Sequence, residues 1–293
     1  MTQTTARGRD ELGTARELEL AGGRIRYWER GDGPVVLFVH GLLVNADLWR
    51  KVVPLVAAGG LRCIAADWPL GSHEIAVPDA DLSPPGVAAL IADFLDRLDL
   101  HDVTVVANDT GGAITQILMT QHPERIGRVV LTPSDCFERF FPPMFALLPK
   151  LARVPGGTWA LVQLLRLRAT HRLPLAFGWL TKRPVPAGVM DSYLQPSRRS
   201  AAVRLDLARF LRRVDSKHTL AAATKLPGFT KPVLLAWSGE DRLFPLSLAR
   251  RLDAVLPDAR LVIVPDTFTF IPEDQPDRLA ELIVEFARDH AAT

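Results

Sequence analysis

Short runs of apolar residues alternate along most of this chain with amphipathic stretches whose apolar positions recur every three or four residues. Apolar runs of this length are typical of strands buried in a parallel sheet, and the amphipathic stretches are typical of helices that pack on one. The predicted buried strands are Val35 to Val39, Arg62 to Ala66, Val103 to Ala107, Arg128 to Leu131, Val233 to Trp237 and Leu261 to Val264. The predicted helices are Pro84 to Leu98, Ile114 to Gln121, Leu246 to Val255 and Arg278 to Arg288. We therefore predict an α/β fold with a mostly parallel sheet flanked by helices.

The beginning of the chain departs from this alternation. Two short strand-like segments, Leu18 to Leu20 and Arg24 to Glu29, flank Gly22 and Gly23 in a pattern typical of a hairpin. Residues 1–16 are polar and of mixed charge, and we expect them to form a mobile N-terminal tail.

A long segment without strong strand signals interrupts the alternation at residues 136–228. It contains apolar positions at helical spacing and many prolines. We interpret it as a helical insertion between two strands of one sheet. The predicted core therefore consists of residues 17–135 and 229–293.

Charge is distributed unevenly, although the whole chain has a formal net charge of only +2. Residues 139–231 contain 17 Lys and Arg side chains and three acidic ones, which gives +14, and the remainder holds 18 basic and 30 acidic side chains, which gives −12. A basic insertion would raise the local concentration of anionic ligands, and a solvated basic face balanced by the acidic core is the alternative. No nucleic-acid recognition motif accompanies the charge. We expect a small-molecule substrate, with an anionic or carrier-bound one left open.

Composition narrows the class of protein further. The chain has 293 residues, of which 48% are hydrophobic and 23% charged, as in globular enzymes. Cys63 and Cys136 are too few for a disulfide framework and lack metal-ligand spacing, so we expect no metal site and no cofactor. No run is long enough to span a membrane, and the first residues lack the apolar core of a signal peptide. We expect a cytoplasmic protein, and the oligomeric state stays open.

A predicted strand-to-helix turn at residues 107–112 carries the most specific chemical signal. Its sequence, Ala-Asn-Asp-Thr-Gly-Gly, has small residues two before and two after Asp109. Such a tight turn brings backbones close together and points its middle side chain outward, which is the geometry of a nucleophile elbow. Asp109 is therefore the predicted nucleophile. The alternative is that this aspartate only caps the following helix.

A second element supports this interpretation. The pair His40-Gly41 directly follows a predicted buried strand. A loop there can point the backbone N–H of Leu42 at the same place as the N–H of Thr110. Two such donors would form an oxyanion hole.

Together these features resemble the α/β-hydrolase superfamily over about residues 17–290. The motifs that carry the resemblance are the His40-Gly41 loop, the Asp109 elbow, Pro123-Glu124-Arg125, the acid region Trp237 to Pro245 and the stretch Phe270 to Pro276. Because it has an aspartate at the elbow, the chain resembles the branch that includes haloalkane dehalogenases, fluoroacetate dehalogenases and epoxide hydrolases. The resemblance implies that Asp109 forms an alkyl ester that water then cleaves. It also implies that residues 136–228 are a helical cap.

The resemblance further implies an acid that orients a catalytic base. Asp241 follows the predicted strand Val233 to Trp237 and fits this role, although Ser238 stands where the family often has glycine. Asp135, after the strand Arg128 to Leu131, is an alternative because some dehalogenases take their acid from that point. A solvated loop aspartate is the simpler interpretation of either residue.

The chain departs from the family at the base itself. By the resemblance, Thr269 occupies the place of the histidine, in the stretch Thr269-Phe270-Ile271-Pro272. Threonine has no pKa near neutrality and cannot activate water as imidazole does, so an ester on Asp109 would lack its usual route to hydrolysis. His73, at the carboxyl end of a strand, is the best substitute base. The other histidines are expected at the far side of the sheet, in the cap or in the tail, namely His101, His122, His171, His218 and His290.

Two positions bear on the choice between a haloalkane dehalogenase and an epoxide hydrolase. Thr110 follows the nucleophile where this branch usually has tryptophan or arginine, which disfavours a typical haloalkane dehalogenase. Epoxide hydrolases typically use two cap tyrosines, and the two tyrosines here are Tyr27, in an early strand, and Tyr193. The remaining predicted residues of the pocket are His40, Asn108, Trp159, Trp179, Tyr193 and Thr269.

The leading hypothesis is an α/β-hydrolase-fold enzyme that acts on a small organic substrate between cap and core. Hydrolysis by this enzyme would need a substitute base. Two alternatives stay open: non-hydrolytic chemistry such as elimination or cyclisation, in which Asp109 acts as an acid or base, and a catalytically inactive protein that binds a ligand in the same pocket.

Overall fold

An eight-stranded sheet forms the centre of the computed structural model, which describes residues 9–174 and 176–290. In the order β1-β2-β4-β3-β5-β6-β7-β8, the pairs β1–β2 and β2–β4 are antiparallel and the others are parallel. The strands are β1 Thr14–Leu20, β2 Gly23–Arg30, β3 Val35–Val39, β4 Arg62–Ala66, β5 Val103–Asp109, β6 Ile126–Ser134, β7 Val233–Ser238 and β8 Ala259–Val264. The predicted mostly parallel sheet is confirmed.

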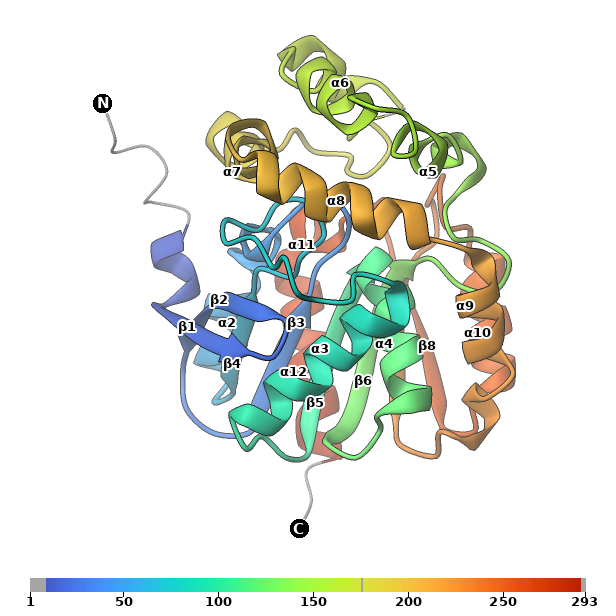
Figure 1. Ribbon diagram of the computed structural model, residues 1–293. Helices are drawn as coiled ribbons and strands as arrows, with labels where there is room; N and C mark the ends of the chain where they lie inside the picture. Colours follow the sequence, from blue (N-terminus) through green and yellow to red (C-terminus); the bar gives the residue numbers. More distant parts are fainter. Residues whose placement is uncertain (1–8, 175, 291–293) are drawn as a thin grey trace.

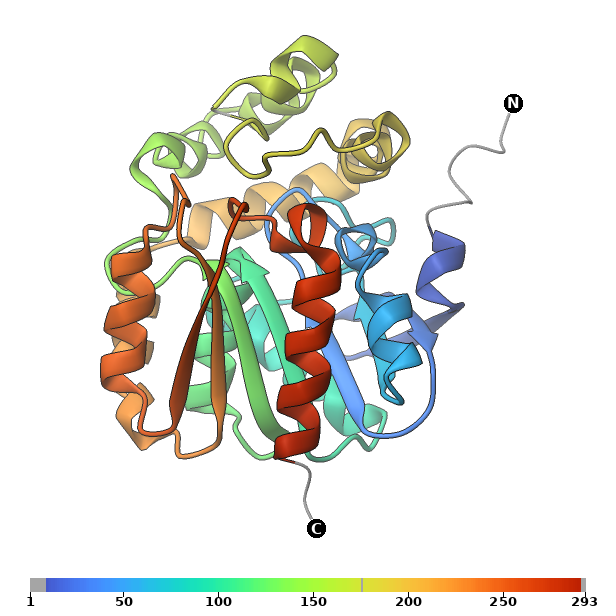
Figure 2. The same ribbon diagram turned by 180° about the vertical axis from the view of Figure 1, so that it is seen from behind.

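Helices cover both faces of this sheet. α3 and α4 lie on one face, and α2 and α12 lie together on the other (Figures 1 and 2). The core helices are α2 Val53–Ala58, α3 Pro84–Arg97, α4 Thr110–Gln121, α10 Leu246–Val255, α11 Ile271–Asp274 and α12 Pro276–Asp289. Within the described residues, no helix is both long enough and apolar enough to cross a membrane.

The expectation that residues 1–16 form a mobile N-terminal tail is wrong for residues 10–16. Residues 1–8 lie outside the described residues. The 3₁₀-helix η1 (Asp10–Leu12) buries Leu12 completely, and β1 pairs with β2 from Thr14 onward. Burial and strand pairing therefore make residues 10–16 part of the fold.

The helices of the predicted insertion fall in two places. α5 (Leu148–Leu151), α6 (Gly157–Leu164), α7 (Ala187–Arg199) and α8 (Ala201–Arg213) lie across one end of the sheet (Figure 1). α9 (Ser216–Ala223) instead packs beside α4. We use the word cap for α5 to α8 with the segments that connect them.

The parallel register determines which strand ends meet beneath the cap. Val39 at the end of β3 pairs with Ala107 of β5, and Asp109 pairs with Ser134 at the end of β6. The loops that leave β3, β5 and β6 therefore lie side by side at the carboxyl edge of the sheet, where α/β folds place their ligands.

Candidate active site

Asp109 lies at a sharp turn between β5 and α4. Its φ of 55° and ψ of −131° are rare for a residue with a side chain, and such strain is concentrated at functional sites. The glycines that follow allow the turn, because a Cβ at Gly111 would lie 2.5 Å from two carbonyl oxygens at the end of β3, and one at Gly112 would lie 2.3 Å from the Ser134 Cβ. The close approach of these backbones thus requires glycine at positions 111 and 112.

Two backbone N–H groups face the Asp109 carboxylate. They belong to Leu42 and Thr110, and both favour its ionised form and so lower its pKa. The carboxylate also lies against the backbone of Gly41, where a Cβ would come 2.2 Å from the Asp109 Oδ2. The two donors predicted to form an oxyanion hole therefore meet at the carboxylate itself, and they can stabilise negative charge on one of its oxygens.

The close approach at Gly41 gives a first prediction. We expect Gly41→Ala to lower the free energy of unfolding by about 1–3 kcal/mol, because the new methyl group overlaps the Asp109 carboxylate in a packed site. Urea unfolding measures this change. Gly228→Ala is the matched control, since a Cβ there has no neighbour within 4 Å, and an equal loss in both variants would contradict the packing argument.

Three carboxyl groups near the elbow have raised pKa values. Burial raises the pKa of Asp109 to about 7, with a contribution from the negative charge of Asp241. Burial raises the pKa of Asp241 to about 6. Burial, together with the charge of Asp109, raises the pKa of Asp135 well above its usual range. Asp109 is therefore poised to gain or lose a proton near neutral pH.

A hydroxyl group occupies the position at which the resemblance implies an imidazole. The Thr269 Oγ1 donates to the Asp241 Oδ2 at 2.8 Å. The other oxygen of Asp241 accepts the N–H groups of Leu243 and Phe244, each at 2.7 Å. Asn108 donates to the Thr269 carbonyl oxygen at 2.8 Å, which fixes the backbone of this position. Asp241 thus lies beside position 269, where its partner is a hydroxyl group and not an imidazole.

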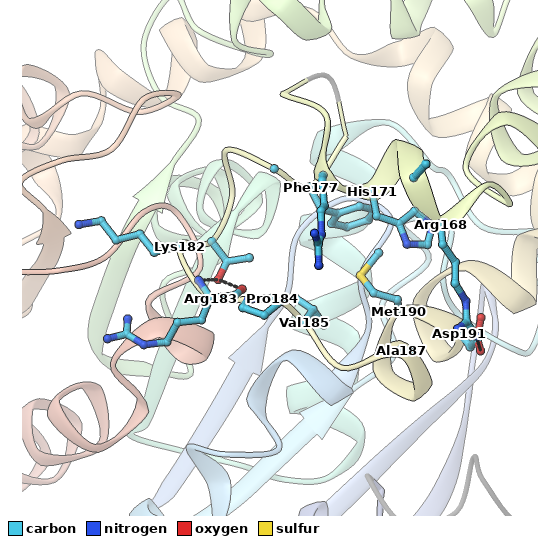
Figure 3. Close-up of a pocket in the computed structure, with 14 residues that line it drawn as sticks. Arg168, His171, Phe177, Lys182, Arg183, Pro184, Val185, Ala187, Met190 and Asp191 are labelled. Atoms are coloured by element: carbon cyan, nitrogen blue, oxygen red, sulfur yellow. Dashed lines mark hydrogen bonds and ion pairs between the residues drawn. The ribbon is translucent and has the colours of Figure 1, made fainter.

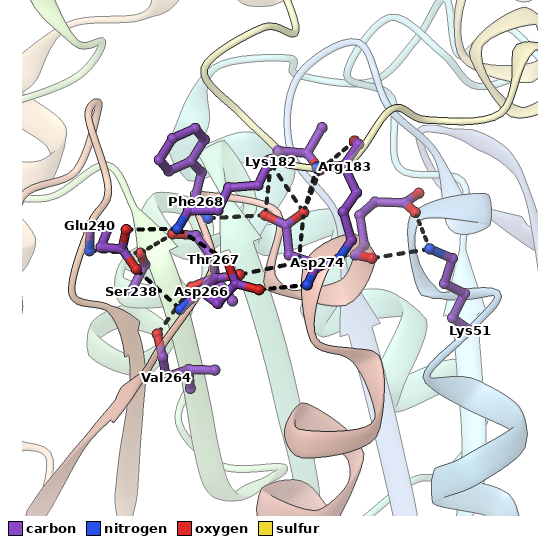
Figure 4. Close-up of polar contacts among 12 residues, drawn as sticks. Lys51, Lys182, Arg183, Ser238, Glu240, Val264, Asp266, Thr267, Phe268 and Asp274 are labelled. Atoms are coloured by element: carbon purple, nitrogen blue, oxygen red, sulfur yellow. Dashed lines mark hydrogen bonds and ion pairs between the residues drawn. The ribbon is translucent and has the colours of Figure 1, made fainter.

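The loop after β8 that leads to this threonine is held from two sides (Figure 4). The Ser238 Oγ donates to the Thr267 carbonyl oxygen at 2.6 Å, which ties the loop to the end of β7. The Phe268 N–H donates to the Asp274 Oδ2 at 3.0 Å, and the same carboxylate accepts the backbone N–H of Lys182 in the cap. The serine that departs from the family pattern therefore has a structural role, and Asp274 joins loop, α11 and cap.

His40 is locked in a neutral form beneath the loop. The Trp68 backbone N–H donates to its Nε2 at 2.9 Å, so the proton is on Nδ1, which lies 2.9 Å from the Gly41 carbonyl oxygen. Burial lowers the pKa of His40 to about 4. The free lone pair of the ring is occupied, so His40 holds the loop after β3 in place and cannot serve as a base.

His73 is directed toward the cap. Its Nε2 lies 3.2 Å from the Asp206 Oδ2 on α8, and both side chains are buried. Asp206 also accepts the backbone N–H of Val77 at 2.9 Å. The contact joins the loop after β4 to the cap helix, and His73 is not among the described residues that line the cavity at Asp109.

That cavity lies between the elbow and the cap and has a volume of about 70 Å³. Its lining residues are Leu42, Leu43, Asp109, Thr110, Phe141, Pro142, Phe145, Leu148, Leu161, Leu165, Ala176, Phe177 and Leu180. Among the described residues of this wall, only Asp109 and Thr110 have polar side chains. The volume holds about five to seven atoms of the size of water, well below the roughly 300 Å³ of an ordinary ligand pocket.

The structure does not place the other predicted pocket residues in this wall. They are His40, Asn108, Trp159, Trp179, Tyr193 and Thr269. Trp159 is 55% exposed on the outside of the cap. Trp179 packs under the Arg242 guanidinium at 5.5 Å, and Tyr193 is fully buried with its ring stacked on Phe177. The apolar cap residues that do line the cavity have no chemical signature in the sequence.

A second, larger cavity of about 780 Å³ lies within the cap and shares Phe177 with the first (Figure 3). Arg168, Arg172, Lys182 and Arg183 contribute to its lining. The charged ends of Lys182 and Arg183 point away from it, toward Asp266 (Figures 3 and 4). Of the two remaining arginines, Arg168 pairs with Asp191, another lining residue, at 3.7 Å.

Metal ligands are not assembled anywhere in the described ranges, 9–174 and 176–290. No group of three or more His, Cys, Asp or Glu side chains there is arranged to hold a metal ion.

Comparison with known proteins agrees with the fold. The sequence profile described as alpha/beta hydrolase fold matches residues 34–276. "Haloalkane dehalogenase 2" of Mycobacterium tuberculosis strain H37Rv is 30% identical over 279 residues, which cover 90% of this chain and 91% of that protein.

Solved structures show the same fold. The haloalkane dehalogenase DatA from Agrobacterium tumefaciens C58 superposes with a TM-score of 0.79 at 21% identity, covering 96% of this chain and 99% of that one. The epoxide hydrolase CorEH superposes with a TM-score of 0.79 at 16% identity, covering 94% and 99%. At these identities the likeness extends to the fold alone.

Proposed function

Because this chain belongs to the α/β-hydrolase fold family, we propose that it is an enzyme whose Asp109 attacks the carbon of a small apolar alkyl electrophile. The observation that carries this proposal is the pair of N–H groups, from Leu42 and Thr110, directed at a carboxylate on a strained elbow. This arrangement orients one carboxylate oxygen and leaves the other to attack.

The bond changes are those of a nucleophilic substitution. A carboxylate oxygen of Asp109 forms a bond to the alkyl carbon, and the carbon–halogen bond breaks with release of halide. The product is an alkyl ester of Asp109. The backbone donors then hold the ester carbonyl oxygen, which would carry the negative charge if water attacked the ester.

The second half of a hydrolytic cycle lacks its base. Water must lose a proton as it attacks the ester, and Thr269 offers only a hydroxyl group bonded to Asp241. His40 has no free lone pair, and His73 faces Asp206. We therefore infer that the ester persists and that hydrolysis is slow.

The cavity favours a small and apolar substrate. Its wall is apolar apart from Asp109 and Thr110, and its volume is about 70 Å³. The Thr110 Oγ1 lies 3.3 Å from the Asp135 Oδ2, and no other polar side chain of the wall is available to hold the leaving group. We expect substrates with good leaving groups, such as short bromoalkanes and iodoalkanes, to react faster than chloroalkanes.

Intact-protein mass spectrometry tests the proposal directly. The protein is incubated with bromoethane, 1-bromobutane, a small epoxide and an activated ester, beside Asp109→Ala. The expected result is a stoichiometric alkyl adduct that is absent from the variant. If no substrate gives either an adduct or a product, that result would contradict an attacking Asp109.

The pH dependence of adduct formation gives a further prediction. Attack requires the ionised carboxylate, and the pKa of Asp109 is raised to about 7. The rate should therefore rise about tenfold per pH unit below pH 7 and level off above it. Asp241→Asn should move the midpoint to lower pH, because it removes a negative charge that raises the pKa of Asp109. A flat profile between pH 5 and pH 8 would contradict this assignment.

A second candidate function rests on the same pKa. A carboxyl group with a pKa of about 7 is an effective acid or base at neutral pH, and elimination or cyclisation requires no activated water. Under this alternative, products appear without any adduct and depend on Asp109. The mass spectra distinguish the two functions.

A further inference from the structure

The outer layer of the cap, residues 147–173, exposes an unusual number of large apolar side chains. Six of the ten exposed large hydrophobic residues in the described chain belong to it, namely Leu147, Val154, Trp159, Leu164, Leu167 and Leu173. Their exposed fractions run from 51% to 69%. Exposed apolar surface gathered in one region of a globular protein marks a site of interaction.

Helix α6 carries part of this surface. Its sequence, Gly-Thr-Trp-Ala-Leu-Val-Gln-Leu, contains no charged residue, and only Gly157 and Val162 are buried. A surface helix normally presents polar side chains to water, yet the exposed positions here are Trp159, Ala160 and Leu164. Figures 1 and 2 show α6 at the outer end of the molecule, beyond α7 and α8.

The same layer carries charge of one sign. Between residues 147 and 173 the sequence has five Lys and Arg residues and no Asp or Glu. All five are exposed: Lys150, Arg153, Arg166, Arg168 and Arg172. Segments that lie in the interface of an anionic membrane typically have exposed tryptophan and leucine side chains between basic residues.

The inward side of this layer reaches the active-site cavity. Leu148 and Leu165 line the cavity at Asp109, while their neighbours Leu147 and Leu164 are exposed to solvent. A single layer of chain therefore separates the narrow apolar cavity from the outer apolar surface.

We propose that residues 147–173 dock on an anionic lipid surface. Trp159 and Leu164 insert among the acyl chains, and the five cations lie against the lipid headgroups. The negative charge of the lipid complements this uniformly basic layer. The docking does not depend on the chemistry at Asp109.

Co-sedimentation with lipid vesicles tests the proposal. One set of vesicles contains phosphatidylcholine and phosphatidylglycerol at roughly 3:1, and the other contains phosphatidylcholine alone. We expect the full chain to bind the anionic vesicles at least about tenfold more tightly, and to be released at about 0.5 M salt, which screens the headgroup attraction.

Paired variants separate the two contributions. Trp159→Ser combined with Leu164→Ser, and Arg166→Glu combined with Arg168→Glu, should each weaken binding about tenfold or more. Matched controls on the core are Ile263→Ser, at a position that is 50% exposed, and Arg260→Glu, which should both leave binding unchanged. Thermal unfolding confirms that each variant folds. Asp109→Ala should bind vesicles like the parent, so the docking is tested separately from the proposed chemistry.

Three results would overturn the proposal. One is folded parent protein in the supernatant with both kinds of vesicle, and another is core controls that weaken binding as much as the cap variants do. The third is a dimer in analytical ultracentrifugation that Leu164→Ser dissociates, because that result would assign the surface to a second copy of the chain.

Discussion

Thr269→His is expected to convert stoichiometric alkylation into turnover. An imidazole at this position would have Asp241 as its partner, because the Thr269 hydroxyl already bonds to that carboxylate at 2.8 Å. The N–H groups of Leu243 and Phe244 fix the other oxygen of Asp241, so the acid need not move. General-base catalysis contributes roughly 10²–10⁴-fold to rates, and we expect ester hydrolysis to accelerate by at least about 10².

Continuous bromide release with 1-bromobutane measures this gain. The parent should release about one equivalent of bromide per protein, and the variant should release many. Thr269→Gln is the matched control, because its side chain has a similar reach but no basic nitrogen. A gain in the glutamine variant equal to that of the histidine variant would mean that space or water access, rather than the base, limits hydrolysis.

Asp109→Asn is expected to abolish alkylation and at the same time to stabilise the fold. Burial raises the pKa of this carboxyl from 3.8 to about 7, so the folded protein binds its proton more tightly than the unfolded chain does. Stability is therefore lost as the pH rises from about 4 to about 7 and stays reduced above that range. An amide carries no charge, so we expect a gain of up to about 4 kcal/mol at pH 8 and less than about 1 kcal/mol at pH 4.

Urea unfolding at the two pH values measures the gain, and mass spectrometry measures the loss of the adduct. The control is Asp253→Asn on α10, where the aspartate is exposed. Stability gains that are equal at pH 4 and pH 8 would contradict a cost due to buried charge. An adduct that persists in Asp109→Asn would place the nucleophile elsewhere.

The sheet and the elbow could be predicted from the sequence because their signals are local. A fully apolar run such as Val103 to Ala107 is typical of a buried strand wherever it occurs. The small residues around Asp109 indicate the close approach that the glycines at 111 and 112 allow. The placement of Thr269 shortly before a proline likewise indicated which residue lies beside Asp241.

The wall of the cavity and the partner of His73 could not be predicted, because both depend on long-range packing. His73 meets Asp206 across 133 residues of sequence, and a single aspartate in the cap has no feature that indicates this contact. Phe141, Leu161 and Leu180 line the cavity but look like any apolar residue of a helical segment. Trp159 was predicted to line the pocket because tryptophans often do so, yet it lies on the outer surface.

The lifetime of the alkyl ester tests the proposed chemistry most directly. Protein treated with 1-bromobutane is freed of excess reagent, and the mass of its Asp109 peptide is followed over time in the parent and in Thr269→His. We predict that the butyl ester persists for hours in the parent and disappears in the variant as butanol is released. Loss of the ester from the parent at the rate seen in the variant, with release of butanol, would show that this chain contains a working base and would contradict the proposal.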